Sequence, residues 1–178
     1  TLAVNGVLGG TLDVLAGRLQ GTGTVGSTHI GGGAVIAPGN SIGTLNVAGN
    51  ATFEAGSIYE IEVDPNSTAG DRIHATGTVT INGGTVQHVG LGGAYAPFKS
   101  YTIIAADGGV NGTFAAVASD FAFLDPTLSY DPNNVYLTLI RNDVGFGSVG
   151  WTPNQIATGF GVESLGLGNP VYDAVLGL

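Results

Sequence analysis

The sequence contains no cysteine and no methionine among its 178 residues. Without cysteine there is no disulfide framework, no thiolate nucleophile and no zinc site with cysteine ligands. The fold must therefore be stabilised by packing and hydrogen bonding. The lack of cysteine is compatible with export through an oxidising compartment, and equally with chance in an organism that uses little cysteine.

Positive charge is scarce as well. Four basic residues stand against 13 acidic ones, which gives a formal net charge of −9. The basic residues form no cluster that could neutralise successive phosphates, so nucleic acid is not an expected partner. An anionic membrane surface would repel such a chain. These four residues are Arg18, Arg72, Lys99 and Arg141.

Long apolar runs are also missing. No run reaches about 18 residues, and the first residues, 1–6, lack a basic segment followed by an apolar one. We therefore expect neither a membrane-spanning helix nor direct membrane insertion, and the sequence shows no signal peptide. Because the sequence opens in a strand-like pattern and stops after an apolar helical one, we expect it to be part of a longer polypeptide.

Glycine, in contrast, is abundant. The 32 glycines lie between short runs rich in Val, Ile, Thr and Phe, as in residues 44–53. Glycine adopts positive φ at little cost, so this spacing predicts many strands joined by tight turns. With 43% hydrophobic and 10% charged residues, the chain can fill a core and does not have the composition of a disordered linker. A β-solenoid or a β-sandwich is expected.

Residues 1–57 contain a loose repeat in which a glycine and a small residue precede a short apolar strand. Units this short cannot bury an apolar face alone, so they must stack on their neighbours. The sequence therefore predicts an all-β fold, with coils of a right-handed parallel β-helix over 1–57. The repeat occurs at residues 10–14, 23–26, 33–38 and 43–47.

Longer strands follow in residues 58–141. Tyr59, Ile61 and Val63 alternate with Glu60 and Glu62, which predicts one buried and one solvated face. Further strands are expected at 78–81 and 85–87, arranged with the preceding ones either as hairpins or as successive coils, and at 101–104 and 135–140. In the last of these, Val135, Leu137 and Leu139 share a face. We interpret residues 58–141 as a region that caps the stack.

The pattern changes in residues 142–178. Thr152-Pro153 and Asn169-Pro170 each place an N-cap residue before a proline at the first helical position. Two short helices are predicted. The glycines in this tail weaken the first helix and favour a connector that becomes rigid through a partner.

Several motifs that could indicate chemistry have simpler explanations. Residues 39–43 match G-x-S-x-G, but a strand rather than a helix follows Ser41, so we read a turn at Pro38-Gly39-Asn40 instead of a hydrolase nucleophile. Residues 21–26 match G-x-G-x-x-G without a following helix, which argues against dinucleotide binding. No catalytic residue, metal site or cofactor is expected from these motifs.

The titratable candidates are weak too. His29, His74 and His88 are far apart in sequence, and solvated or turn positions are expected for them. Asp64, Asn66 and Asp71 could ligate calcium but lack the ligand spacing, so an Asx-type turn is favoured. The Glu60 and Glu62 carboxylates have no basic or aromatic neighbour in the sequence pattern, and a solvated face is expected.

Residues 36–45 (IAPGNSIGTL), 57–63, 71–73 and 75–79, together with later strands at 101–104 and 135–139, resemble the C-terminal passenger region of Gram-negative type V autotransporters. Residues 152–155 and 169–172 look like the segment that leads to the translocator barrel. Gln87-His88-Val89 departs from the more apolar strand usual there. The family motif and capping core would then comprise Pro38, Gly39, Asn40, Ser41, Gly43, Tyr59, Ile61, Val63, Asp71, Gly77, Tyr101, Leu124, Val135, Leu137 and Leu139.

This resemblance implies a non-catalytic module: β-helix coils in 1–57, an autochaperone in 58–141, and a linker in 142–178. Its partner would be the protein's own C-terminal β-barrel translocator, with a host surface ligand for the parent passenger, and its location the bacterial cell surface or the medium. Two alternatives stay open. One is an adhesin solenoid that binds host glycan or protein, and the other is a pectate-lyase-like enzyme acting on polysaccharide.

Overall fold

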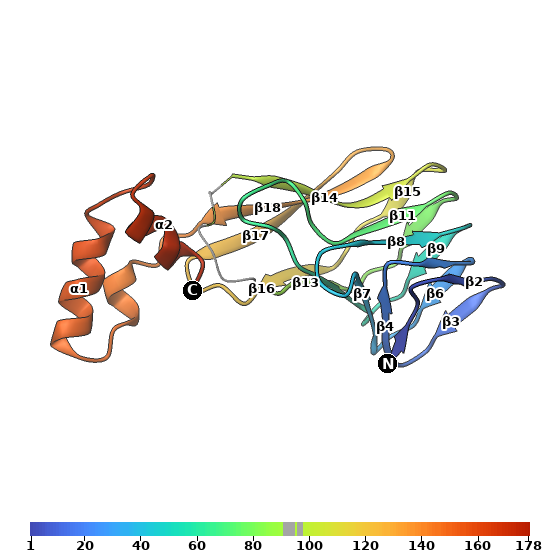
Figure 1. The fold of residues 1–178 in the computed structure, drawn as a ribbon, viewed down its shortest axis with the longest axis horizontal. Coiled ribbons are helices and arrows are strands. Elements are labelled where there is room, and N and C mark those ends of the chain that lie inside the picture. Colours follow the sequence, from blue (N-terminus) through green and yellow to red (C-terminus); the bar gives the residue numbers. More distant parts are fainter. Residues whose placement is uncertain (91–94, 96–97) are drawn as a thin grey trace.

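The computed structural model describes residues 1–90, 95 and 98–178. The chain winds through three sheets in rotation, so that each turn adds one strand to each sheet (Figure 1). Neighbouring strands in β1–β16 run parallel. This is a parallel β-helix, and the fold class predicted from the sequence, a β-solenoid with a short helical tail, is confirmed. The strands between residues 58 and 87, expected either as hairpins or as coils, are successive turns of the β-helix.

The strands of each sheet stack in chain order. The first sheet contains β1 (Leu2–Ala3), β4 (Gly17–Gly21), β7 (Ala34–Pro38), β10 (Ile58–Ile61), β13 (Thr85–His88) and β16 (Ala116–Ser119). The second contains β2 (Val7–Leu8), β5 (Thr24–Val25), β8 (Thr44–Val47), β11 (Arg72–Ala75), β14 (Ser100–Ala106), β18 (Asn134–Arg141) and β17 (Leu124–Tyr130). The third contains β3 (Leu12–Val14), β6 (Thr28–Ile30), β9 (Ala51–Phe53), β12 (Val79–Ile81) and β15 (Val110–Gly112).

Apolar side chains line the interior because the strands stack in register. Ile73 of β11 pairs with Leu45 below it and with Ile104 above it, and all three are fully buried. The strand period of two sends alternate residues inward, so each apolar column continues from coil to coil. A single coil exposes its apolar inner face, whereas a neighbouring coil covers it. This burial stabilises the stack by about 1.5–3 kcal/mol for each buried aliphatic side chain.

Glycines occupy one corner of the stack, between the second and third sheets. The Gly77 amide donates to the Gly49 carbonyl oxygen (2.9 Å), and the Gly108 amide donates to that of Gly77 (3.0 Å). A Cβ on Gly77 would lie 2.2 Å from the Asn50 Oδ1 atom and 2.8 Å from the Gly49 carbonyl. The coils can therefore approach closely at this corner only because no side chain stands between them.

The C-terminal end of the stack is closed by an antiparallel hairpin. Strand β18 pairs antiparallel with β14 on one side and with β17 on the other, and the register on β14 shifts between Thr102 and Ile104. The outermost strand, β17, carries Pro126, which has no amide hydrogen to donate to a further strand. The hairpin thus ends the second sheet.

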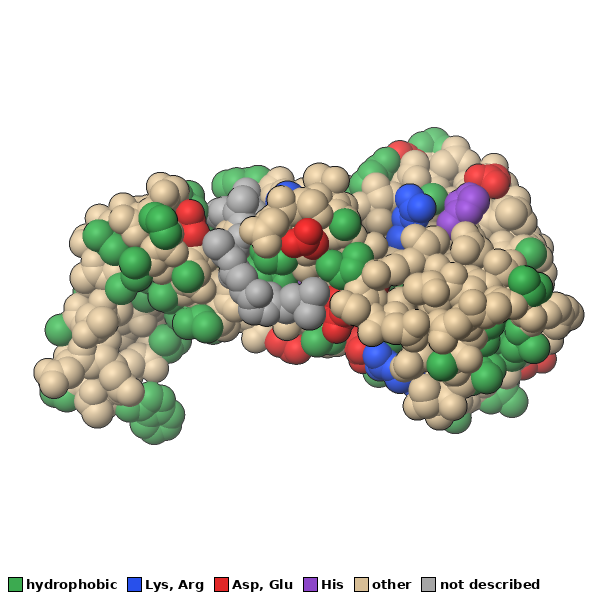
Figure 2. Space-filling model, in the orientation of Figure 1, with side chains coloured by type: hydrophobic (Ala, Val, Ile, Leu, Met, Phe, Trp, Pro, Cys, Tyr) green, Lys and Arg blue, Asp and Glu red, His purple; other side chains and the backbone are tan. Residues whose placement is uncertain are grey.

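A tail with short helices follows the hairpin. It contains a 3-10 turn, η1 (Phe146–Val149), and the helices α1 (Pro153–Glu163) and α2 (Pro170–Leu176). Both predicted N-caps are confirmed: Thr152 forms a capping box with Gln155, and the Asn169 side chain accepts from the Val171 amide. Apolar side chains gather on the surface of this tail (Figure 2). In the described part of the chain, no helix has the length and apolarity to cross a membrane.

Candidate functional site

The motif loop, residues 38–43, joins β7 to β8. Gly39 has φ +87°, and its backbone exchanges two hydrogen bonds with that of Gly21, at 2.9 and 3.0 Å. The Asn40 amide group donates to the Asn5 side chain (2.9 Å). The loop is therefore a turn fixed to the coils beneath it, as expected, and Ser41 does not lie at the start of a helix.

Asp71 supports this loop from the next coil. Its Oδ1 atom accepts the Gly43 amide (2.8 Å), its Oδ2 atom accepts the Glu62 amide (2.9 Å), and only 3% of the residue is exposed. Burial raises the pKa of this carboxyl to about 7, although the two amides favour the ionised form. Asp71 is thus a buried brace between two loops and is not part of a cation-binding turn with Asp64.

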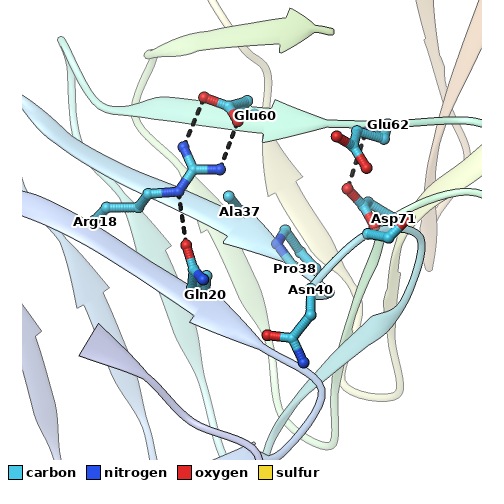
Figure 3. Close-up of a pocket in the computed structure, with 10 residues that line it drawn as sticks. Arg18, Gln20, Ala37, Pro38, Asn40, Glu60, Glu62 and Asp71 are labelled. Atoms are coloured by element: carbon cyan, nitrogen blue, oxygen red, sulfur yellow. Dashed lines mark hydrogen bonds and ion pairs between the residues drawn. The ribbon is translucent and has the colours of Figure 1, made fainter. Parts of the chain in front are cut away.

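A basic residue does accompany the glutamates, contrary to the expectation from the sequence. The Arg18 guanidinium binds the Glu60 carboxylate with both terminal nitrogens, at 2.6 and 2.8 Å (Figure 3). The pair spans β7 and lies over the small side chain of Ala37. The ion pair could not be predicted from the sequence because its partners are 42 residues apart, and only the register of the coils brings them together.

A small polar cavity of about 130 Å³ lies between this ion pair and the motif loop (Figure 3). The three histidines do not line it; they contact Glu54, Asp107 and Ser119 elsewhere. Among the described residues, no group of three or more His, Cys, Asp and Glu side chains could hold a metal ion. The cavity thus brings together residues that fix a loop, and among the described residues the Ser41 hydroxyl forms no hydrogen bond with a carboxylate or a histidine.

Tyrosine hydroxyls connect the fourth coil, which begins with β10, to the hairpin end of the stack. The Tyr59 hydroxyl donates to the carbonyl oxygen of Ile103, in the irregular part of β14. Tyr101 donates to the Asp64 carbonyl (3.1 Å), and Tyr95 donates to the Val63 carbonyl (3.2 Å). Burial raises the pKa of the Tyr59 and Tyr101 hydroxyls, so they remain donors at neutral pH.

An aromatic cluster fills the interior next to these bonds. The Phe114 ring centroid lies 5.2 Å from that of Phe53 and 6.1 Å from that of Tyr59. Such edge or tilted contacts add to the burial free energy, by about 0.5–1.5 kcal/mol per pair. The Phe114 amide also donates to the Tyr130 hydroxyl of β17 (3.1 Å). The cluster therefore couples the last coils to the hairpin.

The hairpin contributes the remaining apolar residues of the predicted capping core. Leu124, Val135, Leu137 and Leu139 are each at most 1% exposed, and Leu137 pairs with Tyr101 in β14. The alternate residues of β18, such as Thr138, are half-buried on the opposite face. The structure thus brings one group of the predicted residues together in a single core: Tyr59, Ile61, Val63, Tyr101, Leu124, Val135, Leu137 and Leu139. A second group forms the separate motif-loop site: Pro38, Gly39, Asn40, Ser41, Gly43 and Asp71. Gly77 lies apart from both, at the glycine corner.

Arg141 connects the hairpin to the tail. Its guanidinium binds the Glu163 carboxylate (2.8 Å) and lies over the rings of Phe123 and Phe146, at 5.6 and 4.9 Å. Glu163 also accepts the Phe146 amide, and the Tyr172 ring packs on Phe146. The Arg141 side chain therefore connects Phe123, next to the hairpin, with Phe146 of η1 and Glu163 of α1.

The expectation that all three histidines are solvated is wrong for His88. Its side chain is fully buried, whereas His29 and His74 are partly exposed and face carboxylates, Glu54 at 3.3 Å and Asp107 at 3.2 Å. The sequence did contain a pattern that indicates burial: Val86 and His88 are two residues apart in a strand, so their side chains lie on the same face. The polarity of histidine obscured it.

Comparison with known proteins finds relatives among extracellular proteins. The chain is 34% identical over 168 residues to an extracellular serine protease of Serratia marcescens, which covers 89% of this chain and 16% of that protein. It is 28% identical over 145 residues to a second extracellular serine protease of the same species, which covers 76% of this chain and 14% of that protein. No protein-family model matches the chain. The chain is homologous to a small region of these extracellular proteins, about a sixth of their length.

Proposed function

We propose that this chain is the C-terminal part of a Gram-negative autotransporter passenger, where it nucleates the folding of a longer β-helix and supports its secretion across the outer membrane. The observation that carries the proposal is the difference between the two ends of the stack. At one end the second sheet is closed by the antiparallel hairpin, whereas at the other end all three sheets present strands that can accept a further coil.

The first coil has the features of an end that can be extended. In the described chain, each of β1, β2 and β3 pairs with a strand on one side only. Leu2 and Leu8 pair with the fully buried Leu19 and Val25 of the next coil, yet they are 44% and 39% exposed, so apolar surface of the interior remains open at this end. A preceding coil would pair with these strands and cover these side chains.

The other end differs in its second sheet, although β15 and β16 of the other two sheets also pair on one side only in the described chain. Strand β18 covers β14, the apolar side of β18 faces the core, and Pro126 interrupts the outer edge. Pro126 offers no amide donor to a further strand there. Growth of the second sheet is thereby favoured in one direction, from the hairpin toward the N-terminus.

This direction suits export in which the C-terminal coils emerge first. Coils that fold outside the membrane give each following coil a template, and burial of its apolar surface contributes about 25 cal/mol per Å². Folding then opposes the return of the chain into the pore. The process needs no nucleotide, and we place any proteolytic activity of the parent protein outside this segment.

In this account residues 1–57 are stem, 58–141 are the autochaperone and 142–178 lead to the protein's own barrel translocator. The residues of the capping core and of the motif loop act by packing and bracing and not by catalysis. An adhesin would favour a row of exposed aromatic side chains on the strands. The highly exposed Trp151 lies in the tail, so this alternative has no such row among the described residues to support it.

Substitutions on opposite faces of β18 test the proposal in the parent protein. Leu137→Asn places a polar group in the core and should cost about 3 kcal/mol or more, whereas Thr138→Asn alters the neighbouring half-buried position. At matched barrel levels, we expect Leu137→Asn to reduce the protease-resistant passenger on the cell surface several-fold and Thr138→Asn to leave it unchanged. Equal amounts of resistant passenger for both variants would contradict the proposal.

A further inference from the structure

His88 lies inside the stack, beneath the last strand of the first sheet. It is the final residue of β13 and pairs with Ile61 of β10 on one side and with Ser119 of β16 on the other. None of its surface is exposed. A buried imidazole therefore lies where β13 pairs with β16, the last strand of this sheet.

Among the residues that the structure describes, only one nitrogen of this ring has a hydrogen-bond partner. The Nδ1 atom lies 2.9 Å from the Ser119 hydroxyl oxygen, which also accepts the Phe121 amide (3.2 Å). The Nε2 atom is buried and has no partner. A buried polar atom without a partner costs free energy in either neutral tautomer.

Aromatic rings enclose the other sides of the imidazole. The Phe121 and Tyr95 ring centroids lie 5.1 and 6.1 Å from that of His88, both in edge-on geometry. Such surroundings suit a neutral ring. A protonated ring would carry a charge and a second N–H donor, and the Nε2–H group would have no acceptor.

One charged group acts on this ring among its described neighbours, the carboxylate of Asp120 next to Ser119. It accepts a bond from Gln87 (3.0 Å), whose side chain points away from the core. Glu60 of β10 and Glu62, just after this strand, also face outward, and Glu60 is paired with Arg18. Burial outweighs the attraction of Asp120 and lowers the pKa of His88 to about 4.

We infer that His88 is an acid-sensitive switch: while its ring is neutral it holds β16 against β13, and when the ring takes up a proton it releases the last turn of the first sheet. The switch concerns the stability of the closed end in acid. It does not depend on the proposed role in export, and it holds whatever the parent protein does.

The sign of the effect follows from linkage. The unfolded histidine has an ordinary pKa of about 6.5, above the native value of about 4, so the open state binds more protons between these two pH values. The closed state therefore loses stability as the pH falls from about 6.5 to about 4. Over this window the equilibrium constant for opening should rise on the order of a hundredfold.

Amide hydrogen exchange of the full chain tests the inference. Between pH 7 and pH 4.5, after correction for intrinsic exchange, we expect protection in β13 and β16 to fall by at least tenfold while protection in β7 and β8 is retained. His88→Gln and His88→Leu carry no titrating group, so they should remove this selective loss. His74→Gln makes the same change at a partly exposed histidine and should leave the loss as in the wild type.

The histidine ring can also be followed directly by nuclear magnetic resonance. We expect the His88 ring to remain neutral in the native state through pH 5, with its signals lost only as β16 opens. The inference is overturned if the His88 ring titrates near its ordinary pKa with protection unchanged, or if His88→Gln keeps the selective acid response. The wild-type measurements decide the question even if neither His88 variant folds.

Discussion

The Tyr59 hydroxyl donates a hydrogen bond to the backbone carbonyl oxygen of Ile103, where β14 shifts register against the hairpin. Tyr59 belongs to the fourth coil and Ile103 to the last strand that the coils add to the second sheet. An irregular strand leaves backbone groups without ladder partners, and a buried carbonyl needs a donor. One side chain thus joins the regular stack to its closed end.

Tyr59→Phe should leave this carbonyl oxygen without its donor inside the core. We expect the free energy of unfolding to fall by about 1–3 kcal/mol, the cost of an unsatisfied buried acceptor. Urea denaturation at pH 7 measures the change. Tyr136→Phe removes a hydroxyl that binds Asp131 at an exposed turn and should cost clearly less, because water replaces the lost partner. Equal losses in the two variants would contradict this role of Tyr59.

Asp71 should make part of the stability depend on pH. Its native pKa of about 7 lies above the ordinary value of 3.8, so its contribution is fully present below 3.8 and is lost as the pH rises through 7. Asp71→Asn cannot titrate. The urea midpoint of the wild type, relative to that of Asp71→Asn, should therefore fall between pH 4 and pH 7.5. The His88 effect has the opposite sign and cancels in this difference, and a constant difference would refute the shift.

Gly77→Ala should destabilise the coils at the glycine corner. The added Cβ would lie 2.2 Å from the Asn50 side chain and 2.8 Å from the Gly49 backbone, so the neighbouring coil must move. We expect a loss of about 1–3 kcal/mol, typical of overpacking. The control is Gly161→Ala in α1, where nothing lies within 4 Å and helix propensity favours alanine by about 1 kcal/mol. Thermal unfolding of both variants distinguishes a steric clash of the added methyl group from the general effect of replacing glycine by alanine.

Arg141→Gln should loosen the tail while leaving the hairpin folded. The substitution removes the ion pair to Glu163 and the contact with two aromatic rings, in a side chain that is 14% exposed. We expect local opening of α1 to become easier by about 2 kcal/mol. Limited proteolysis should then cut within residues 142–152 faster than in Arg72→Gln, an exposed arginine that serves as control. If the hairpin lost protection together with the tail, residues 142–178 would not be a separate unit.

Much of the fold follows from local sequence pattern. Alternation placed Tyr59, Ile61 and Val63 on one buried face, and two N-cap and proline pairs located the helices, because both signals lie within a few neighbouring residues. The repeat of glycine and short apolar strands predicted a solenoid for a physical reason, since such units must stack. These predictions needed no knowledge of the stacking register.

The contacts that register creates could not be predicted in this way. Arg18 and Glu60 lie two coils apart, and Asp71 reaches a loop 28 residues earlier. His88 was misjudged because a polar side chain was assigned to solvent, although the strand period sends it inward beside Val86. In a solenoid, a side chain's neighbours are set by the number of residues in each coil, and loops of unequal length hide that number from the sequence.

The most direct test of the central claim is the order in which the coils fold. Pulse-labelling hydrogen exchange during refolding of the full chain measures when the amides of each strand become protected. We expect amides of β14, β17 and β18 to be protected in the first phase, followed by those of β11, β8 and β5 in that order. Protection of β5 and β8 before the hairpin, or of all strands at once, would contradict a nucleus at the C-terminal end.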